Sequence, residues 1–124
     1  MTTQKPQLRG NGLFTDVPES LKKIARELRD SKGWAFYSVK QRRGTCYFNS
    51  KVITIPTFAI YHKNPKYKIW YIAHELSHAL VGRGHGHNQV FMNKLIEICP
   101  SDSIHYELGY KPRNASRAGI LLEL

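Results

Sequence analysis

The stretch Ile72-Ala-His-Glu-Leu-Ser-His-Ala-Leu80 decides how this chain of 124 residues is interpreted. It belongs to a segment in which apolar residues recur at the three- and four-residue spacing of a helix: Ile69, Ile72, Ala73, Leu76 and Leu80. This apolar stripe predicts a helix over residues 66–81. The glycines of the following Gly82-Arg-Gly84 are poor helix formers and end it there.

Three residues of the predicted helix, His74, Glu75 and His78, form the pattern His-Glu-x-x-His. Positions four apart on a helix lie about 40° apart and one turn along the axis, so both imidazoles can reach the same metal ion. Glu75 lies about 60° round from His78, where its carboxylate can take a proton from a metal-bound water. We therefore predict that His74 and His78 bind Zn²⁺. Glu75 is the predicted general base of a zinc metalloendopeptidase, which hydrolyses peptide bonds.

A catalytic zinc usually takes three protein ligands and leaves one position for water, so a third ligand is needed. The metzincin spacing is excluded, because it requires glycine at position 81 and histidine at position 84, where this chain has Val81 and Gly84. Three candidates remain further along the chain: His85, His87 and Glu97. Glutamates on helix faces are usually solvated, whereas a glycine-rich turn can bring its histidines back over the helix. A histidine of this turn is therefore favoured over Glu97.

The flanking segments predict the rest of an α+β domain. Apolar residues at helical spacing, together with the capping-box pair Asp16 and Glu19, predict a helix over about residues 17–32. Aromatic and β-branched residues predict short strands at 34–39, 45–49 and 52–55. Because the connections are too short for crossovers, we expect these three strands to form an antiparallel sheet. After the central helix we expect a further helix, from residue 88 or 89 to 98, and a candidate strand at 105–110.

Lysine and arginine outnumber aspartate and glutamate by 19 to 9, which gives a net charge of +10 and suggests a polyanionic partner such as nucleic acid. No apolar run approaches the ~18 residues of a membrane helix, and the first residues lack the apolar core of a secretion signal. We therefore expect a soluble, cytoplasmic protein with no membrane partner. Its two cysteines, Cys46 and Cys99, are expected to be reduced. The length suits a single domain, placed at residues 13–124 after a flexible N-terminal arm at 1–12.

Three segments between Gly44 and Leu95 carry a resemblance to a known family. Residues 44–56 (GTCYFNSKVITIP) are similar to a family pattern of a glycine, a short strand, a polar turn and an apolar strand. The central helix matches the pattern His-Glu-Leu-x-His-Ala. His87-Asn-Gln-Val-Phe91 keeps the histidine and phenylalanine of a His-Gly-x-x-Phe motif, with Asn88 in place of glycine. On these residues the chain resembles the SprT-like zinc metallopeptidases, the family that includes the Spartan proteases.

This resemblance implies a small zincin-like domain in which His74, His78 and His87 bind Zn²⁺ and Glu75 is the general base. It favours His87 over His85, because the residue four after His85 is glutamine. Relatives of the Spartan type act on proteins bound to DNA, so the resemblance also implies DNA-associated protein substrates. The small size is similar to stand-alone members of bacterial viruses, which would place the protein in the cytoplasm of a host cell.

Two further groups of residues complete the predictions. Basic residues in loops are candidates for DNA contacts: Lys40, Arg42, Arg43, Lys63, Lys66 and Lys68. Candidate partners for the oxyanion of the reaction lie near the C-terminus: His105, Tyr106, Tyr110 and Arg113. The alternative function is a non-catalytic, basic nucleic-acid-binding module with a structural zinc, in which a fourth protein ligand would close the metal site.

Overall fold

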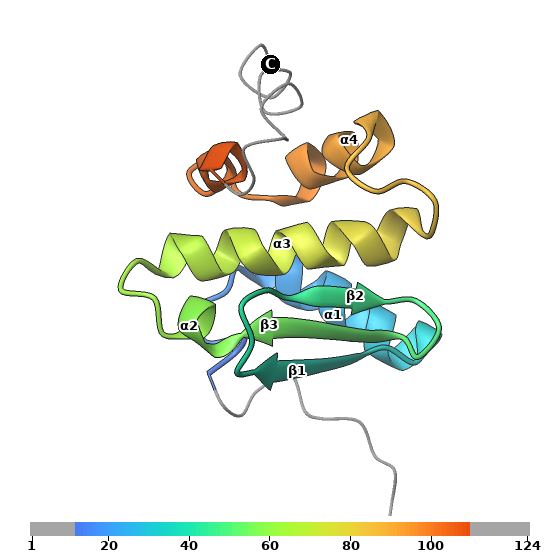
Figure 1. Cartoon of the computed structure of the whole chain (residues 1–124), viewed down its shortest axis with the longest axis horizontal. Helices are drawn as coiled ribbons and strands as arrows, with labels where there is room; N and C mark the ends of the chain where they lie inside the picture. The colour runs from blue at the N-terminus through green and yellow to red at the C-terminus, as the bar shows by residue number, and fades with distance from the viewer. Residues whose placement is uncertain (1–11, 110–124) are drawn as a thin grey trace, which may run out of the picture.

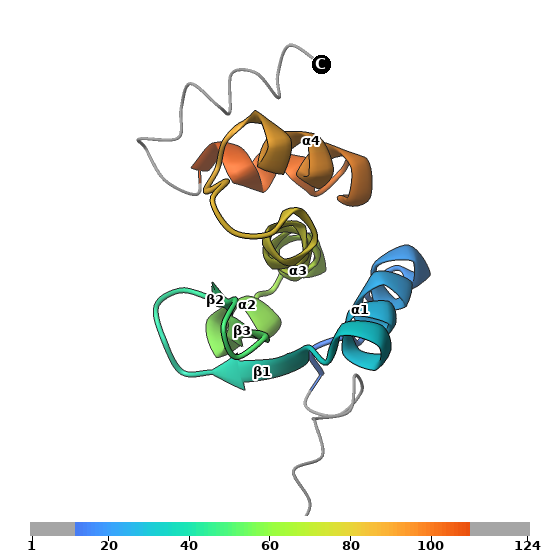
Figure 2. The same cartoon turned by 90° about the vertical axis from the view of Figure 1, so that its right-hand side faces the viewer.

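Helix α3 (Pro65–Val81) lies at the centre of the computed structural model, which describes residues 12–109. The other elements are α1 (Glu19–Lys32), β1 (Ala35–Val39), β2 (Thr45–Tyr47), β3 (Val52–Pro56), α2 (Thr57–Ile60), α4 (Gln89–Ile98) and the 3-10 helix η1 (Ile104–Gly109). Figure 1 shows α3 between the sheet on one side and α4 with η1 on the other. Viewed along α3, α1 also lies on the sheet side (Figure 2). The fold is α+β, as expected. The helices of residues 12–109 include none that is both long and apolar enough to cross a bilayer.

The sheet is mixed, so the expectation of an antiparallel sheet is wrong. Its strand order is β1-β3-β2, with β1 parallel and β2 antiparallel to the central strand β3. The expectation assumed that strands consecutive in sequence are neighbours in the sheet. Instead, residues 40–44 pass over the end of β3, a span of two strand spacings or about 10 Å, which a short loop reaches at about 3.3 Å per residue. β2 and its flanking turns therefore form the crossover between two parallel strands.

Helix α3 is buried on nearly all sides because other layers cover it on both faces. Every residue from Trp70 to Ser77 is buried, including three polar ones, His74, Glu75 and Ser77. Ser77 satisfies its hydroxyl locally by donating a hydrogen bond to the carbonyl oxygen of Ala73, at 2.8 Å. A helix surrounded in this way usually carries apolar residues there, so a histidine and a glutamate at its middle point to a function beyond packing.

Other boundaries differ from the expected ones in ways that local geometry explains. The first helix begins at Glu19 with Pro18 as its N-cap and with no side-chain cap, because Asp16 adopts a left-handed conformation (φ 62°) that rules out the expected capping box. Gly33 ends this helix in a left-handed conformation, at the boundary expected from the sequence. The short helix α2 was not expected. Residues 104–109 form a 3-10 helix, so the strand expected at 105–110 is wrong. The expected arm at 1–12 and the end of the domain lie almost wholly outside the described residues.

Gly44 brings the loop before β2 close to α3. Its amide donates a hydrogen bond to the hydroxyl of Tyr71 at 2.7 Å, and the site is buried. A β-carbon at this position would overlap the backbone oxygen of Thr54 and would lie 2.8 Å from Cε1 of Tyr71. Only glycine therefore allows the loop before β2 and the central helix α3 to pack at this distance.

We expect Gly44→Ala to lower the free energy of unfolding by about 2–3 kcal/mol, because the added methyl group meets backbone that cannot move aside independently. Urea denaturation followed by tryptophan fluorescence would measure this change. Gln41→Ala, in the same loop but exposed, is the control and should change stability by less than about 0.5 kcal/mol. An unchanged midpoint for Gly44→Ala would show that the contact between the loop and α3 can relax.

Candidate metal centre

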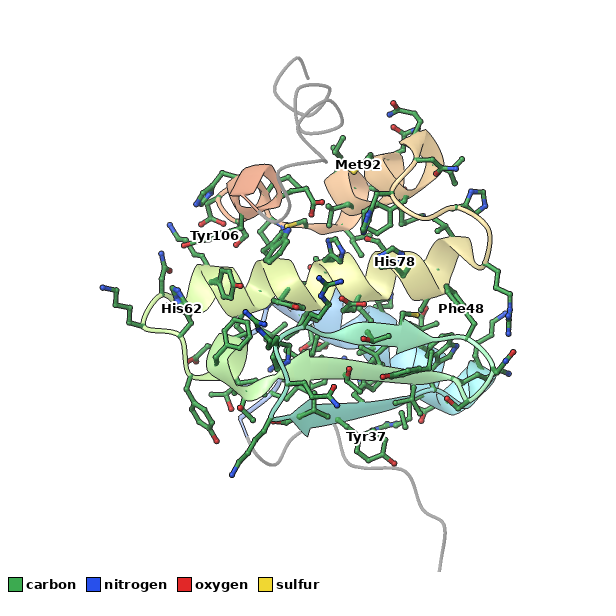
Figure 3. All side chains as sticks on the ribbon, viewed as in Figure 1. Tyr37, Phe48, His62, His78, Met92 and Tyr106 are labelled. Carbon is green, nitrogen blue, oxygen red and sulfur yellow. The ribbon has the colours of Figure 1, made fainter. Side chains whose placement is uncertain are left out.

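The imidazoles of His74, His78 and His87 converge on one point. Nε2 of His87 lies 3.2 Å from Nε2 of His74 and 3.2 Å from Nε2 of His78. One potential ligand atom from each residue lies within 4.8 Å of the others, so the three histidines could hold a metal ion. α3 supplies the first two, and the loop between α3 and α4 supplies the third. Figure 3 shows His78 on α3, toward the end that leads into this loop.

The distances between these nitrogens suit a shared cation better than hydrogen bonds. In a tetrahedral zinc site with Zn–N bonds of about 2.0–2.1 Å, neighbouring nitrogens are about 3.3–3.4 Å apart. Nδ1 of His74 lies 2.8 Å from a carboxylate oxygen of Glu107, so we place the proton of neutral His74 on Nδ1 and a lone pair on Nε2. Nε2 of His87 carries at most one proton and cannot donate to both other rings. A single cation satisfies all three nitrogens.

Phe91 packs against all three imidazoles. Its fully buried ring is stacked on His78, with 4.3 Å between centroids, and its centroid lies 5.0 Å from those of His74 and His87. Asn88 is the N-cap of α4, and its side-chain oxygen accepts a hydrogen bond from the amide of Phe91 at 3.2 Å. Where the family motif has glycine, Asn88 therefore begins the helix that carries Phe91.

The other two candidates for third ligand lie elsewhere. Nδ1 of His85 lies 3.2 Å from the side-chain nitrogen of Asn88, at the start of α4. Glu97 is exposed on α4, and its carboxylate pairs with Nζ of Lys94 at 3.1 Å. Neither belongs to the cluster that could hold a metal in the described part of the chain. The geometry thus favours His87.

Glu107 is a residue of this site that the sequence interpretation missed. It lies on η1 and is 1% exposed. Its Oε1 lies 2.8 Å from Nδ1 of His74 and accepts a hydrogen bond from the indole of Trp70 at 3.0 Å. A carboxylate behind a metal-binding histidine is a common arrangement in metalloproteins. No local pattern could have found it, because 33 positions separate Glu107 from His74 and only the packing of η1 on α3 brings them together.

A cleft of about 300 Å³ opens beside the three histidines. Besides these histidines, the residues that line it are Arg43, Gly44, Thr45, Cys46, Phe48, Glu75, Gly82, Gly84 and Gly86. Glu75 thus shares the cleft with the three histidines that could hold a metal ion. Burial, with a smaller contribution from the charge of Glu75, raises the pKa of the Cys46 thiol to about 12. The thiol is therefore protonated at neutral pH, and Cys46 does not belong to the cluster that could hold a metal in the described part of the chain.

The two oxyanion candidates that the structure describes, His105 and Tyr106, do not line this cleft. The hydroxyl of Tyr106 accepts a hydrogen bond from the side-chain nitrogen of Asn64 at 2.9 Å, near the start of α3. His105 is exposed and packs against the ring of Tyr106. Figure 3 places Tyr106 at the opposite end of α3 from Phe48, which lines the cleft. Tyr110 and Arg113 lie outside the described residues.

The residues predicted to contact DNA differ in exposure. Four of them are exposed in loops: Lys40, Arg42, Arg43 and Lys63. Lys66 is exposed and pairs with Asp102 at 3.4 Å. Lys68 is only 5% exposed, and its Nζ donates hydrogen bonds to the carbonyl oxygens of Gly12 and Thr15 at 2.9 and 2.6 Å. Lys68 is therefore not available for DNA: it ties the segment before α1 to α3, and burial lowers its pKa.

The donor set and its surroundings fit a zinc ion. Three imidazole nitrogens are donors that zinc accepts, and the cleft beside them also contains the carboxylate of Glu75. The buried carboxylate of Glu107 adds negative charge behind His74, which a cation would balance. Comparison of the chain with protein-family models, curated proteins and solved structures found no match.

Proposed function

We propose that this protein is a zinc metalloendopeptidase of the SprT-like type. The observation that carries the proposal is the convergence of three Nε2 atoms, from His74, His78 and His87, in the cleft that also contains Glu75. The alternative, a binding module with a structural zinc, would need a fourth protein ligand. The cluster in the described part of the chain holds three. This supports the catalytic alternative.

The chemistry divides between the metal and the protein. When bound, zinc would supply a Lewis acid that polarises the substrate carbonyl and lowers the pKa of a water molecule in its open position. Glu75 accepts the proton of the attacking water and delivers it to the leaving amine. Its carboxylate is held in place because the whole residue is 2% exposed and lies in the continuously buried stretch of α3. A fixed base of this kind loses little entropy when the substrate binds.

Strand β2 offers a place for the peptide beside this chemistry. It is an edge strand of the sheet in the described part of the chain, and Thr45 and Cys46 of β2 line the cleft. An edge strand presents backbone amides and carbonyls that an extended peptide can pair with as an additional strand. A peptide bound in this way would lie beside the cleft that contains Glu75. The arrangement supports cleavage within a chain rather than removal of a terminal residue.

Cleavage should depend on the metal. We expect the purified protein loaded with zinc to cleave an unfolded protein such as casein, to lose this activity with a chelator, and to recover it when zinc is added back. Magnesium, which prefers oxygen ligands in an octahedral arrangement, should not restore it. Gel analysis and mass spectrometry of the fragments would measure the effect. Cleavage that continues in excess chelator would contradict the proposal.

We propose nucleic acid as a partner of the same cleft, on the basis of the loop between β1 and β2. Lys40, Arg42 and Arg43 are exposed in this loop, and Arg43 also lines the cleft. A phosphate backbone bound there would run beside the cleft. Proteins attached to DNA would then be held close to Glu75. The net charge of +10 is consistent with this mode of substrate delivery.

Replacing Lys40, Arg42 and Arg43 together with alanine should weaken binding to duplex DNA. Each phosphate contact contributes about 0.9 to the slope of log K against log salt, so losing three should reduce that slope by about 2–3. Fluorescence anisotropy between 50 and 200 mM salt would measure it. A variant with alanine at Lys22, Lys23 and Lys32 of α1 loses the same charge away from the cleft and is the control. Equal effects of both variants would show that only total charge matters.

A further inference from the structure

We propose that Glu107 is a positioning residue that holds His74 in the orientation and tautomer needed to bind the metal. The inference rests on the metal site of the proposed function. Glu107 contacts neither the cleft nor the other two histidines among the contacts of the described residues, and it acts only through the imidazole of His74. It comes from η1, an element that the metal-binding motif does not include.

One oxygen of Glu107 fixes the ring of His74. Oε1 lies 2.8 Å from Nδ1 of His74, on the side of the imidazole away from the convergence point at Nε2. A carboxylate accepts hydrogen bonds, so this contact keeps the proton on Nδ1 and leaves Nε2 with a lone pair. Rotation of the ring about its bond to Cβ would break the contact. The same interaction therefore selects both the tautomer and the direction of the lone pair.

The indole of Trp70 holds this oxygen in place in turn. Its Nε1 donates to the same Oε1 at 3.0 Å, and its ring centroid lies 5.4 Å from that of His74. Trp70 and His74 are four residues apart on α3, so both donors point from one face of the helix toward η1. The carboxylate is thereby held by two donors from α3, the same helix that carries the histidine it orients.

The second carboxylate oxygen, Oε2, indicates that Glu107 is not simply part of a polar network that anchors η1. Oε2 is buried and has no hydrogen-bond partner among the described residues. A carboxylate in such surroundings is poorly compensated by two neutral donors. A cation held at Nε2 of His74 would compensate this carboxylate through the imidazole ring. A metal ion at the site would thus offset part of the cost of burying this carboxylate.

The test compares zinc affinity in four variants, measured by competition with a chromogenic chelator. We expect Glu107→Ala to weaken zinc binding about 10- to 100-fold. Glu107→Gln keeps an oxygen that can accept both hydrogen bonds, so it should recover most of this loss. Trp70→Phe removes one donor but leaves the contact with His74, and should change affinity by less than about threefold. Glu97→Ala removes an exposed glutamate and is the matched control.

Two further readouts separate positioning from a general loss of structure. Thermal unfolding without metal reports the stability of each variant independently of the site. The visible absorption of the cobalt-substituted protein reports the geometry around the ion, and we expect Glu107→Ala to alter this spectrum and Glu107→Gln to restore it. Wild-type affinity and an unchanged cobalt spectrum in Glu107→Ala would overturn the inference. Losses in Trp70→Phe equal to those in Glu107→Ala would overturn it as well.

The result for Glu107 can be distinguished from the result for the proposed function. If the wild-type protein binds zinc and Glu107→Ala weakens this binding, the inference holds even if no peptide is cleaved. If the wild type cleaves peptides in a zinc-dependent manner while Glu107→Ala binds zinc normally, the inference fails and the proposed function stands. A wild-type chain that binds no zinc overturns both.

Discussion

Glu75→Gln is expected to lower peptide cleavage by about 10²- to 10⁴-fold while leaving bound zinc unchanged. This is the range in which a positioned general acid or base usually contributes. Glutamine has nearly the shape of glutamate but cannot accept the proton of the attacking water at neutral pH. Because Glu75 is outside the cluster of three histidines that could hold the metal, its replacement should not alter the ligands. Cleavage rates and zinc content measured on the same preparation would check both parts.

The matched control for this variant is Glu97→Gln. Glu97 is a glutamate on the neighbouring helix α4, but it is exposed and pairs with Lys94 at the surface. Its replacement should leave the cleavage rate within about twofold of wild type, because exposed ion pairs contribute little. Wild-type activity in Glu75→Gln would contradict the assignment of the general base. A loss of zinc in this variant would show instead that the carboxylate supports the metal site.

The sequence was sufficient for the elements whose signal is local. The apolar stripe predicted α3 to within one residue at its start and correctly at its end. The same kind of spacing predicted α4 and, with a start two residues too early, α1. Most of the residues that the periodicity selects are buried, because the pattern and the contact surface repeat with the same period; Leu80, at the end of α3, is an exception at 39% exposed.

Strand pairing and the C-terminal element could not be predicted in this way. Strand patterns give the faces of a strand but not its neighbours, so the same residues fit the expected antiparallel sheet and the observed mixed one. In the observed register, Ile53 of β3 lies between Phe36 of β1 and Cys46 of β2. Residues 104–109 carry aromatic and apolar side chains that suit a strand, yet they form η1 because they pack against α3 and not along the sheet.

The residues of the candidate site show the same difference between what local spacing specifies and what tertiary packing specifies. His74, Glu75 and His78 lie within two turns of one helix, so their spacing alone specifies how they face one another. The third ligand depends on how the glycine-rich loop turns. Spacing alone therefore leaves the choice between His85 and His87 open. Gly86 resolves this with a left-handed φ of 52° immediately before His87. Glu107 is joined to the site only by tertiary packing and has no sequence signal of its own.

His87→Ala is expected to weaken zinc binding by more than about 100-fold, the largest effect among the histidines outside α3. Loss of a partner that only supports a ligand already costs about 10- to 100-fold, so loss of the ligand itself should exceed this range. His85→Ala should bind zinc within about threefold of wild type, because His85 faces Asn88 and not the cluster. Competition with a chelator at constant pH would measure both affinities.

His85→Ala, His87→Ala and Glu97→Ala each remove one candidate ligand and leave the other two intact. Phe91 contacts the ring of His87, so the methyl group of alanine leaves a gap beside it, and the unfolding temperature without metal would report any loss of packing. A large loss of affinity in His85→Ala would mean that the loop rearranges when the metal binds. A large loss in Glu97→Ala would mean that α4 turns its exposed face inward. Since α4 already buries Phe91, Met92 and Leu95 on the side facing α3, such a turn would expose the core, and we expect His87 alone to show the effect.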